Sequence, residues 1–279
     1  MKTCLITGST GLLGTNLLKT LPKGIMVVFW DKNEPLPNEF FDYIIHAAGY
    51  GQPAKFMSNE LATIDVNTTL TIELLKRLRG DGKFLFISTS EIYSGAKPPY
   101  TEDQIGTTSP THPRACYIES KRCGEAICLA YRRLGYDVKI ARLSLSYGGA
   151  KKGDSRVLNQ FIERALTEKK IQLLDRGEAK RTYIYVEDAV KILWDILLKG
   201  KEPIYNVGGI SKTTIAELAY KIGKLTGAGV VLGDKGLDGA PEDVCMDISK
   251  IIKEFGKREF IDLDEGLKRT IKWTKDLLT

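Results

Sequence analysis

The chain has 279 residues, a formal net charge of +6 and 43% hydrophobic residues, values that suit one large globular domain or two closely joined ones. No apolar run approaches the roughly 18 residues that cross a bilayer, and the first residues form no basic-then-apolar leader, so we expect neither a membrane span nor a secretory signal. The basic residues are dispersed, which argues against nucleic-acid binding.

The chain has five cysteines, none in a CxxC spacing, and two histidines, His46 and His112. This composition predicts no metal site. It favours reduced thiols and a cytoplasmic location.

Short β-branched runs alternate with amphipathic stretches in the N-terminal part of the chain. Strands are predicted at residues 2–7, 25–30, 43–47, 84–88 and 138–143, and helical spacing of apolar residues occurs at 12–21, 59–78 and 115–134. Repetition of strand, helix and strand predicts an α/β fold, a doubly wound parallel Rossmann-like sheet with right-handed crossovers.

The pattern changes after Gly148. A glycine- and lysine-rich loop at 148–153 precedes a predicted helix at 157–166, short strands at 171–174 and 182–185, and helices at 213–225 and 264–278. We therefore expect a smaller, discontinuous C-terminal substrate lobe. The predicted boundaries are 1–148 for the dinucleotide-binding domain, with 181–207 returning to it, and 149–180 plus 208–279 for the lobe.

A glycine-rich loop, TGSTGLLG at residues 7–14, follows the first strand and opens the first helix. Glycines let the backbone approach a pyrophosphate, and the helix N-terminus stabilises its charge. The alternative is an ordinary glycine-rich turn. The position of the loop favours a dinucleotide site, with the following contacts: Gly8, Thr10, Gly11, Leu12, Leu13 and Gly14.

Asp31 ends the second predicted strand. An acid at this point accepts hydrogen bonds from the adenosine ribose and repels a 2′-phosphate, which favours NAD over NADP. The neighbouring Lys32 weakens that discrimination. The alternative role of Asp31 is a simple strand-terminal cap.

Tyr117 and Lys121 stand four residues apart on a predicted helix and so share one of its faces. An ammonium group beside a phenol lowers the phenol pKa and makes Tyr117 a usable acid/base. Thr89, at the end of the strand before, is placed to share a hydrogen bond with the reacting oxygen. A second Tyr-x-x-x-Lys, Tyr220 to Lys224, is interpreted as a surface helix.

Five motifs occur together in one order: TGSTGLLG, His46-Ala47-Ala48-Gly49, STSEIY at 88–93, YIESK at 117–121 and RTYIYVEDA at 181–189. With the segment 264–271, this set resembles the extended short-chain dehydrogenases that modify nucleotide sugars, the NAD-dependent epimerase/dehydratase family. Segments 113–117 and 153–162 resemble UDP-glucuronate decarboxylases within that family.

The resemblance implies bound NAD, a nucleotide-sugar substrate and transient oxidation of the sugar C4 hydroxyl. Its implied catalytic residues are Tyr117, Lys121, Thr89 and Glu91. Further cofactor contacts are implied for Lys32, Ala47, Ala48, Gly49 and Ser88, and substrate contacts for Ser90, Arg114, Arg156 and Arg181. Arg181 has the alternative role of pairing with Glu187 or Asp188.

Three alternatives to decarboxylation stay open: a 4-epimerase, a 4,6-dehydratase and a non-catalytic NAD-binding scaffold or sensor. The dehydratases usually carry an Asp where this chain has Ser90, which argues against dehydration. An epimerase needs Tyr117, Lys121 and Thr89 but not Glu91.

The chain also departs from the family pattern. Only ten residues lie between Asp31 and Asp42, where most relatives place another helix and strand, so we expect an edge unit to be missing. Leu145 stands where the family usually has Asn, and segment 241–247 lacks an arginine that commonly grips the diphosphate.

Helices near 59–79 and 115–134 form a homodimer in many relatives, which implies the same here. The alternative is that these faces pack only within one chain.

Overall fold

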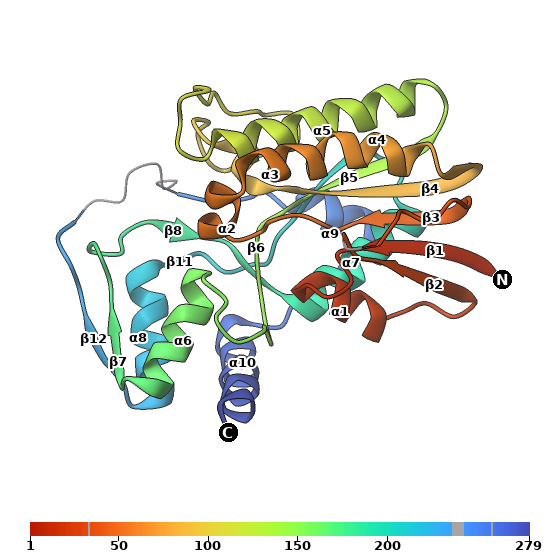
Figure 1. The fold of residues 1–279 in the computed structure, drawn as a ribbon. Helices are drawn as coiled ribbons and strands as arrows, with labels where there is room; N and C mark the ends of the chain where they lie inside the picture. Colours follow the sequence, from red (N-terminus) through yellow and green to blue (C-terminus); the bar gives the residue numbers. More distant parts are fainter. Residues whose placement is uncertain (33, 236–242, 258) are drawn as a thin grey trace.

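A computed structural model describes residues 1–279 except residues 33, 236–242 and 258. Its centre is a six-stranded sheet with all neighbouring strands parallel, in the order β10-β5-β4-β3-β1-β2 (Figure 1). The strands are β1 (Lys2–Thr7), β2 (Ile25–Trp30), β3 (Phe41–His46), β4 (Leu78–Thr89), β5 (Asp137–Leu143) and β10 (Ile204–Val207). The predicted doubly wound parallel sheet is confirmed.

Helices cover both faces of this sheet. One face carries α1 (Leu12–Lys19) and α7 (Val186–Lys199), and the other carries α3 (Glu60–Asn67), α4 (Thr69–Leu75) and α5 (Ala115–Arg133) (Figure 1). Alternate side chains of β1 enter different cores: Ile6 packs with the α7 residues and Leu5 with the α4 and α5 residues. Each such fully buried aliphatic side chain stabilises the fold by about 1.5–3 kcal/mol.

The expected helix at 59–78 is two helices, and its end belongs to a strand. α3 and α4 meet at Thr68, and Leu78 already begins β4. The Thr68 hydroxyl donates to Ile64 O at 2.8 Å, and the Thr71 hydroxyl donates to Asn67 O at 2.8 Å. Hydroxyls that bond back to helix carbonyls favour bending, and two such bonds flank this break.

Among the described residues the sheet ends at β2, which agrees with the expected absence of an edge unit in that part of the chain. The connection after β2 lies against the core instead of adding a strand. Leu36 and Trp30 pack on the cluster that holds Leu5, and Arg77 Nε donates to Pro37 O at 2.8 Å.

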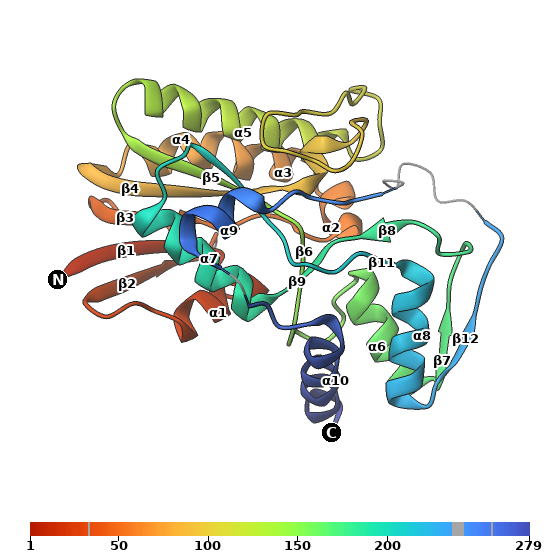
Figure 2. The ribbon, with the colours of Figure 1, turned by 180° about the vertical axis from the view of Figure 1, so that it is seen from behind.

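The C-terminal elements lie beside the sheet (Figure 2), and their buried side chains form a third hydrophobic cluster, here called the lobe cluster. It contains residues of α6 (Val157–Thr167), α8 (Ile215–Thr226) and α10 (Leu263–Leu278), close to the predicted helices. Three two-stranded sheets complete this part: β6 (Leu145–Tyr147) with β9 (Tyr183–Tyr185), β7 (Lys170–Gln172) with β12 (Gly229–Val231), and β8 (Lys180–Arg181) with β11 (Thr213–Thr214).

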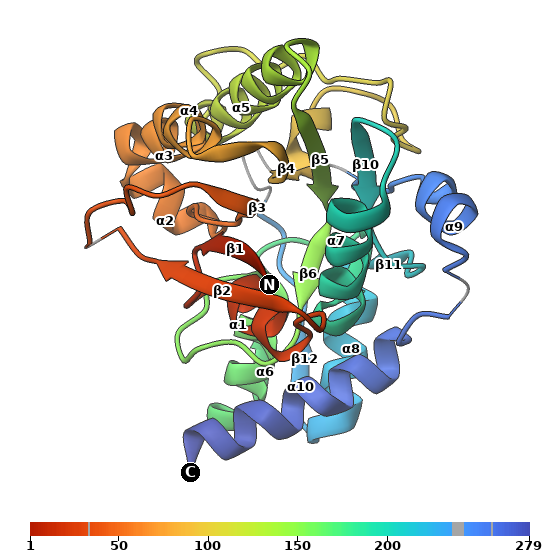
Figure 3. The ribbon, with the colours of Figure 1, turned by 90° about the vertical axis from the view of Figure 1, so that its right-hand side faces the viewer.

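Two short helices lie outside the predicted elements. α2 (Pro53–Ser58) follows β3, and α9 (Ser249–Phe255) packs beside β10 (Figure 3). Among the described residues, no helix combines the length and apolar character that crossing a membrane requires.

Candidate active site

The glycine loop forms a close turn against the end of β3. Gly8 has φ +69°, and a Cβ atom there would lie 2.7 Å from Ala47 O. At Gly14 a Cβ would lie 2.3 Å from Gly8 O, so neither position admits a side chain. Gly11 caps α1 with no side-chain hydrogen bond, which leaves the first N–H groups of this helix to an outside acceptor. This cradle fits the pyrophosphate of a dinucleotide.

His46 joins the ends of β1 and β3. Its Nδ1 lies 2.9 Å from Thr7 Oγ1, its Nε2 lies 2.9 Å from Val66 O, and Ala48 N donates to Thr7 Oγ1 at 3.1 Å. Burial, with the nearby Lys121 ammonium, lowers the pKa of His46 to about 3. His46 is therefore a neutral, fully bonded histidine that fixes the loop from Ala47 to Gly49.

Asp31 and Lys32 follow β2 at the edge of the sheet, where the adenosine end of a dinucleotide bound at the loop would reach. Asp31 is half-buried and Lys32 exposed. The Lys32 ammonium lies 5.6 Å from the ring centre of Tyr50 and 3.4 Å from its hydroxyl. Tyr50 thus lies beside Lys32, just beyond the end of β2.

Tyr117 and Lys121 both reach the carboxyl end of β4 from α5. Thr89 forms a side-chain hydrogen bond with Tyr117, and Lys121 Nζ donates to Ile87 O at 2.7 Å. A Cβ built on Gly49 would lie 3.8 Å from Lys121 Nζ, so the lysine also faces the cofactor loop. The structure brings the predicted Tyr117, Lys121 and Thr89 together beside the glycine crevice.

The ionisation of this pair differs from the expectation. Burial and the Glu91 carboxylate raise the pKa of Tyr117 to about 12, while Thr89 and Arg114 act against them. Burial lowers the pKa of Lys121 to about 7. The lysine is directed at a main-chain carbonyl, so in the chain alone it does not offset the burial of the phenol. The raised pKa of Tyr117 disfavours the phenolate in the chain alone, and the positive nicotinamide of NAD⁺ would favour it when bound.

Glu91 lies beside this pair with two arginines in electrostatic reach. Arg114 Nη2 is 2.8 Å from Glu91 Oε1, and Arg181 also acts on the Glu91 carboxylate. Burial nevertheless raises the pKa of Glu91. Among the described residues, Glu91 Oε2 and Arg114 Nε have no hydrogen-bond partner. The cluster of Glu91, Arg114 and Arg181 therefore retains polar atoms and positive charge for a ligand.

A buried polar network supports the β4 end from below. Ser88 Oγ donates to Glu125 Oε1 at 2.6 Å, and Arg142 Nη2 lies 2.8 Å from Glu125 Oε2. Arg142 Nη1 continues to the Tyr93 hydroxyl at 2.9 Å, and Tyr93 donates to Asn206 Oδ1 at 2.7 Å. These bonds hold β4, β5, α5 and the turn η1 (Ser90–Tyr93), which contains Glu91, in one arrangement.

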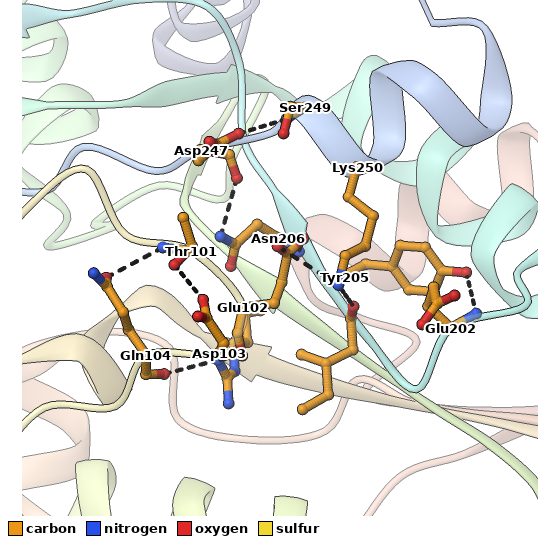
Figure 4. A network of polar contacts seen from close by, with 12 residues as sticks. Thr101, Glu102, Asp103, Gln104, Glu202, Tyr205, Asn206, Asp247, Ser249 and Lys250 are labelled. Atoms are coloured by element: carbon orange, nitrogen blue, oxygen red, sulfur yellow. Dashed lines mark hydrogen bonds and ion pairs between the residues drawn. The ribbon is translucent and has the colours of Figure 1, made fainter.

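Asn206 also anchors the segment that leads from Glu91 to Arg114. Its Nδ2 donates to Tyr100 O and Asp247 O, and its main-chain N donates to Glu102 at 3.0 Å. Figure 4 shows the side chains of this segment gathered around Asn206, with Lys250 close to Glu102. Glu91 and Arg114, 23 positions apart, are thereby held at fixed ends of one anchored loop.

Other predicted substrate residues are placed differently. Arg156 is paired with Asp154 and donates to Ser146 O at 3.1 Å, so its guanidinium is already engaged. Ser90 is buried at the start of η1. Leu145 packs on the lobe cluster, as an apolar residue should, and gives no amide to the site. Segment 241–247 is the one that lacks the diphosphate arginine. Its residues 241 and 242 lie outside the described part, and the main chain of Val244 forms a β-bridge with that of Arg181.

Two residues near the site were not predicted. Asn67 is fully buried, and its Oδ1 has no partner among the described residues and lies 3.8 Å from a Cβ built on Gly49. Phe56 of α2 stacks on Tyr117, with ring centres 4.5 Å apart. Asn67 could have been noticed in the sequence, because an Asn among the apolar positions of an amphipathic helix is buried and its amide then needs hydrogen-bond partners. The stack joins residues 61 positions apart, and no local pattern indicates it.

Comparison with known families gives one match that covers most of the chain. The profile described as "NAD dependent epimerase/dehydratase family" matches residues 4–208.

Two curated relatives are UDP-glucuronic acid decarboxylases. Decarboxylase 1 of Xenopus tropicalis is 32% identical over 250 residues, which are 87% of this chain and 59% of the relative. Decarboxylase 6 of Arabidopsis thaliana is 32% identical over 244 residues, 85% of this chain and 70% of the relative. The chain thus spans only 59% of the length of the Xenopus protein.

A solved structure with the same fold is the UDP-glucuronic acid 4-epimerase from Bacillus cereus in complex with UDP-glucuronic acid and NAD. Its TM-score is 0.85 at 22% identity, over 99% of each chain.

Proposed function

Because the chain belongs to the NAD dependent epimerase/dehydratase family and uses NAD, we propose that it oxidises a nucleotide sugar transiently at C4 and decarboxylates UDP-glucuronate. One observation carries this choice. The Glu91–Arg114 ion pair lies beside Tyr117, and Arg181 also acts on Glu91, so the two guanidinium groups exceed the one carboxylate by a positive charge that suits a sugar carboxylate. The two decarboxylase relatives at 32% identity support it.

The proposed first step is proton removal from the sugar C4 hydroxyl. Tyr117 takes this proton, Thr89 orients the hydroxyl through its shared hydrogen bond, and Lys121 stabilises the phenolate. When bound, NAD⁺ would supply the acceptor and later the donor of the C4 hydride. Gly8, Thr10, Gly11, Leu12, Leu13 and Gly14 would hold its pyrophosphate, Asp31 and Lys32 its adenosine ribose, and Ala47, Ala48, Gly49 and Ser88 its remaining parts.

The C4 ketone makes the substrate a β-keto acid. The C5–C6 bond breaks, its electron pair enters the C4 ketone as an enolate, and C6 leaves as CO₂. C5 then takes a proton, which we assign to Glu91, because burial raises its pKa and favours the protonated form. Arg114 and Arg181 bind the charged groups of the substrate and hold it against Tyr117.

The decisive test is incubation of the full chain with NAD⁺ and UDP-glucuronate labelled with ¹³C at C6. Release of labelled CO₂ together with a UDP-pentose supports decarboxylation. A new UDP-uronate without CO₂ identifies a 4-epimerase, the second candidate, whose fold the Bacillus cereus enzyme shares. Absence of both products on this substrate rejects the proposal.

We also propose a homodimer through the helices near 59–79 and 115–134. The outer side of α3 supports it, because Leu61 is 83% and Ile64 40% exposed. Light scattering on a Leu61→Lys, Ile64→Lys variant tests it: a mass that falls to one chain supports the interface, and an unchanged mass rejects it.

We further propose two domains and a cytoplasmic location. The dinucleotide-binding domain comprises residues 1–148 and 181–207, and the substrate lobe comprises residues 149–180 and 208–279. The free state of all five cysteines agrees with a reducing compartment.

A further inference from the structure

We propose that Phe56 is a positioning residue that fixes the ring of Tyr117 and the Arg114–Glu91 pair in one geometry, and that Gln52 ties this geometry to the substrate lobe. The inference deepens the proposed function, since it takes Tyr117 as the acid/base. It gives α2, a short helix outside the sequence motifs, a role in assembling the site.

The first contact is the stack between Phe56 and Tyr117. The two ring planes differ by 3° and their centres lie 4.5 Å apart, while Phe56 is 1% exposed. A buried ring lying flat on the phenol blocks rotation of that phenol about its Cβ–Cγ bond and limits its swing about Cα–Cβ. The hydroxyl is thereby held toward Thr89.

The second contact is with Arg114. Its guanidinium carbon lies 5.3 Å from the centre of the Phe56 ring, and a cation near an aromatic ring is attracted to the face of the ring. Arg114 also pairs with Glu91, and its Nε has no hydrogen-bond partner among the described residues. Phe56 thus helps to set where this guanidinium lies, and with it Glu91.

The third contact crosses to the lobe. Gln52 is the residue before α2, but its side chain does not cap the helix. Its Oε1 accepts hydrogen bonds from Ser155 N at 3.1 Å and Ser155 Oγ at 2.8 Å. Ser155 lies between Asp154 and Arg156, whose ion pair stiffens the segment that enters α6. A displacement of this segment therefore pulls on α2 and on Phe56.

These contacts join the lobe to the base. Because the Asp154–Arg156 pair already holds its segment, the Gln52 tether fixes α2 to the lobe, and Phe56 keeps its place on Tyr117. The charged groups that face the Tyr117 hydroxyl are Glu91 and Arg114. Phe56 contacts Tyr117 and Arg114, and Arg114 pairs with Glu91. The short helix α2 therefore positions the base Tyr117 directly and the acid Glu91 through Arg114.

The test compares Phe56→Leu with Phe161→Leu, a matched change at a buried phenylalanine of the lobe cluster. We expect Phe56→Leu to lower kcat about 100-fold, the usual effect of a misplacement near 1 Å, with KM changed less than threefold. Phe161→Leu should keep kcat within about threefold at matched thermal stability. Equal effects of the two changes would overturn the positioning role.

A second measurement does not need turnover. In the full chain labelled with ¹³C at tyrosine Cζ, the Tyr117 signal among twelve tyrosines is assigned by its loss in Tyr117→Phe. We expect Phe56→Leu to free the phenol ring, so that the Tyr117 signal broadens and shifts relative to wild type and to Phe161→Leu. A Tyr117 signal with unchanged line width and chemical shift in Phe56→Leu would overturn the inference.

The tether is tested with Gln52→Ala against Ser58→Ala, which removes an exposed hydroxyl at the other end of α2. Gln52→Ala should broaden the Tyr117 signal and lower kcat, and should add little on top of Phe56→Leu, because coupled residues are not additive. Equal behaviour of Gln52→Ala and Ser58→Ala would refute the tether. If wild type fails to turn over UDP-glucuronate, the proposed function fails, while the Tyr117 signal still decides this inference.

Discussion

Glu91 and Arg114 form an ion pair with Oε1 and Nη2 2.8 Å apart, and the other carboxylate oxygen of Glu91 is left without a partner among the described residues. Both side chains are largely shielded from water, at 16% and 13% exposure. An unpartnered buried carboxylate oxygen is costly unless a ligand bonds to it or it carries a proton. Decarboxylation as proposed uses Glu91 as an acid, whereas epimerisation does not need it, so changes at this pair distinguish the two reactions.

Glu91→Gln should lower CO₂ release by 10²- to 10⁴-fold, the usual contribution of a general acid, while leaving NAD binding intact. The raised pKa of Glu91 gives the sign of its pH dependence: activity that needs the protonated acid falls as the pH rises through that pKa, and the variant lacks this falling limb. Stopped assays with ¹³C-labelled substrate across the pH range measure both effects.

Glu265→Gln is the matched control, because Glu265 pairs with Arg269 on the surface of α10, away from η1. Retention of near-wild-type CO₂ release by Glu91→Gln would remove Glu91 from the mechanism. Interconversion of uronates without CO₂ release by the intact chain, retained in Glu91→Gln, would assign the chain to the epimerases.

The sequence predicted the parts of this site that depend on local order. The glycine loop must follow β1 and open α1, and the Tyr117/Lys121 spacing must share a helix face, so both are readable from neighbouring residues. The missing edge unit followed from the short segment between Asp31 and Asp42, which is too short for a helix and a strand.

Contacts between distant residues were not readable in this way. Arg156 and Arg181 looked alike as candidate ligands, but Asp154, two residues away, engages the first, while the fold brings the second to Glu91. The break between α3 and α4 at Thr68 lies next to Asn67, which is near Gly49. It is flanked by two threonine hydroxyls that bond back to helix carbonyls, and the spacing of apolar residues does not predict these bonds. The expected lowering of the Tyr117 pKa by Lys121 missed the burial of both groups.

Lys121→Met should move the rising limb of kcat/KM to higher pH and lower kcat/KM at pH 7 by 10²- to 10⁴-fold. Only the phenolate form of Tyr117 accepts the proton, so activity rises with pH as Tyr117 ionises. In the chain alone, burial and Glu91 already raise the Tyr117 pKa to about 12 without a contribution from Lys121. We expect the Lys121 ammonium to favour the phenolate only once cofactor and substrate close the site, so its removal shifts the pKa of the working enzyme upward. Initial-rate measurements from pH 5 to 10 show the displacement.

The control is Lys83→Met, because Lys83 also donates to a main-chain carbonyl, Leu198 O at 2.6 Å, but at the opposite end of β4. A rising limb that stays in place in Lys121→Met would contradict the electrostatic role of Lys121.

Gly8→Ala should abolish measurable NAD binding, whereas Gly24→Ala should not affect it. Both glycines have positive φ, +69° and +81°, so an alanine is strained at each by about 1–2 kcal/mol. Only at Gly8 would the new Cβ meet Ala47 O at 2.7 Å, while nothing lies within 4 Å at Gly24. Calorimetric titration with NAD⁺, alongside thermal unfolding, separates the two. Equal NAD affinity in both variants would show that the Gly8–Ala47 approach does not shape the dinucleotide cradle.

The neutral, buried His46 makes the fold sensitive to acid. Its pKa is lowered from 6.5 to about 3 in the folded chain, so between these pH values the unfolded chain binds a proton at this site that the folded chain does not. Stability from this site is therefore fully present above pH 6.5 and is lost as the pH falls toward 3, by about 1.4 kcal/mol per pH unit. Urea unfolding at pH 7, 6, 5 and 4 measures the slope.

His46→Gln supplies the comparison, because an amide can accept from Thr7 Oγ1 and donate to Val66 O without titrating. Carboxylates that titrate in the same range contribute to both proteins, so the difference between the two slopes reports His46. We expect the variant to be less stable at pH 7 but to lose less stability on acidification. Parallel slopes would mean that His46 takes up its proton in the folded chain as readily as in the unfolded one, and that it does not hold β1 and β3 together as a neutral residue.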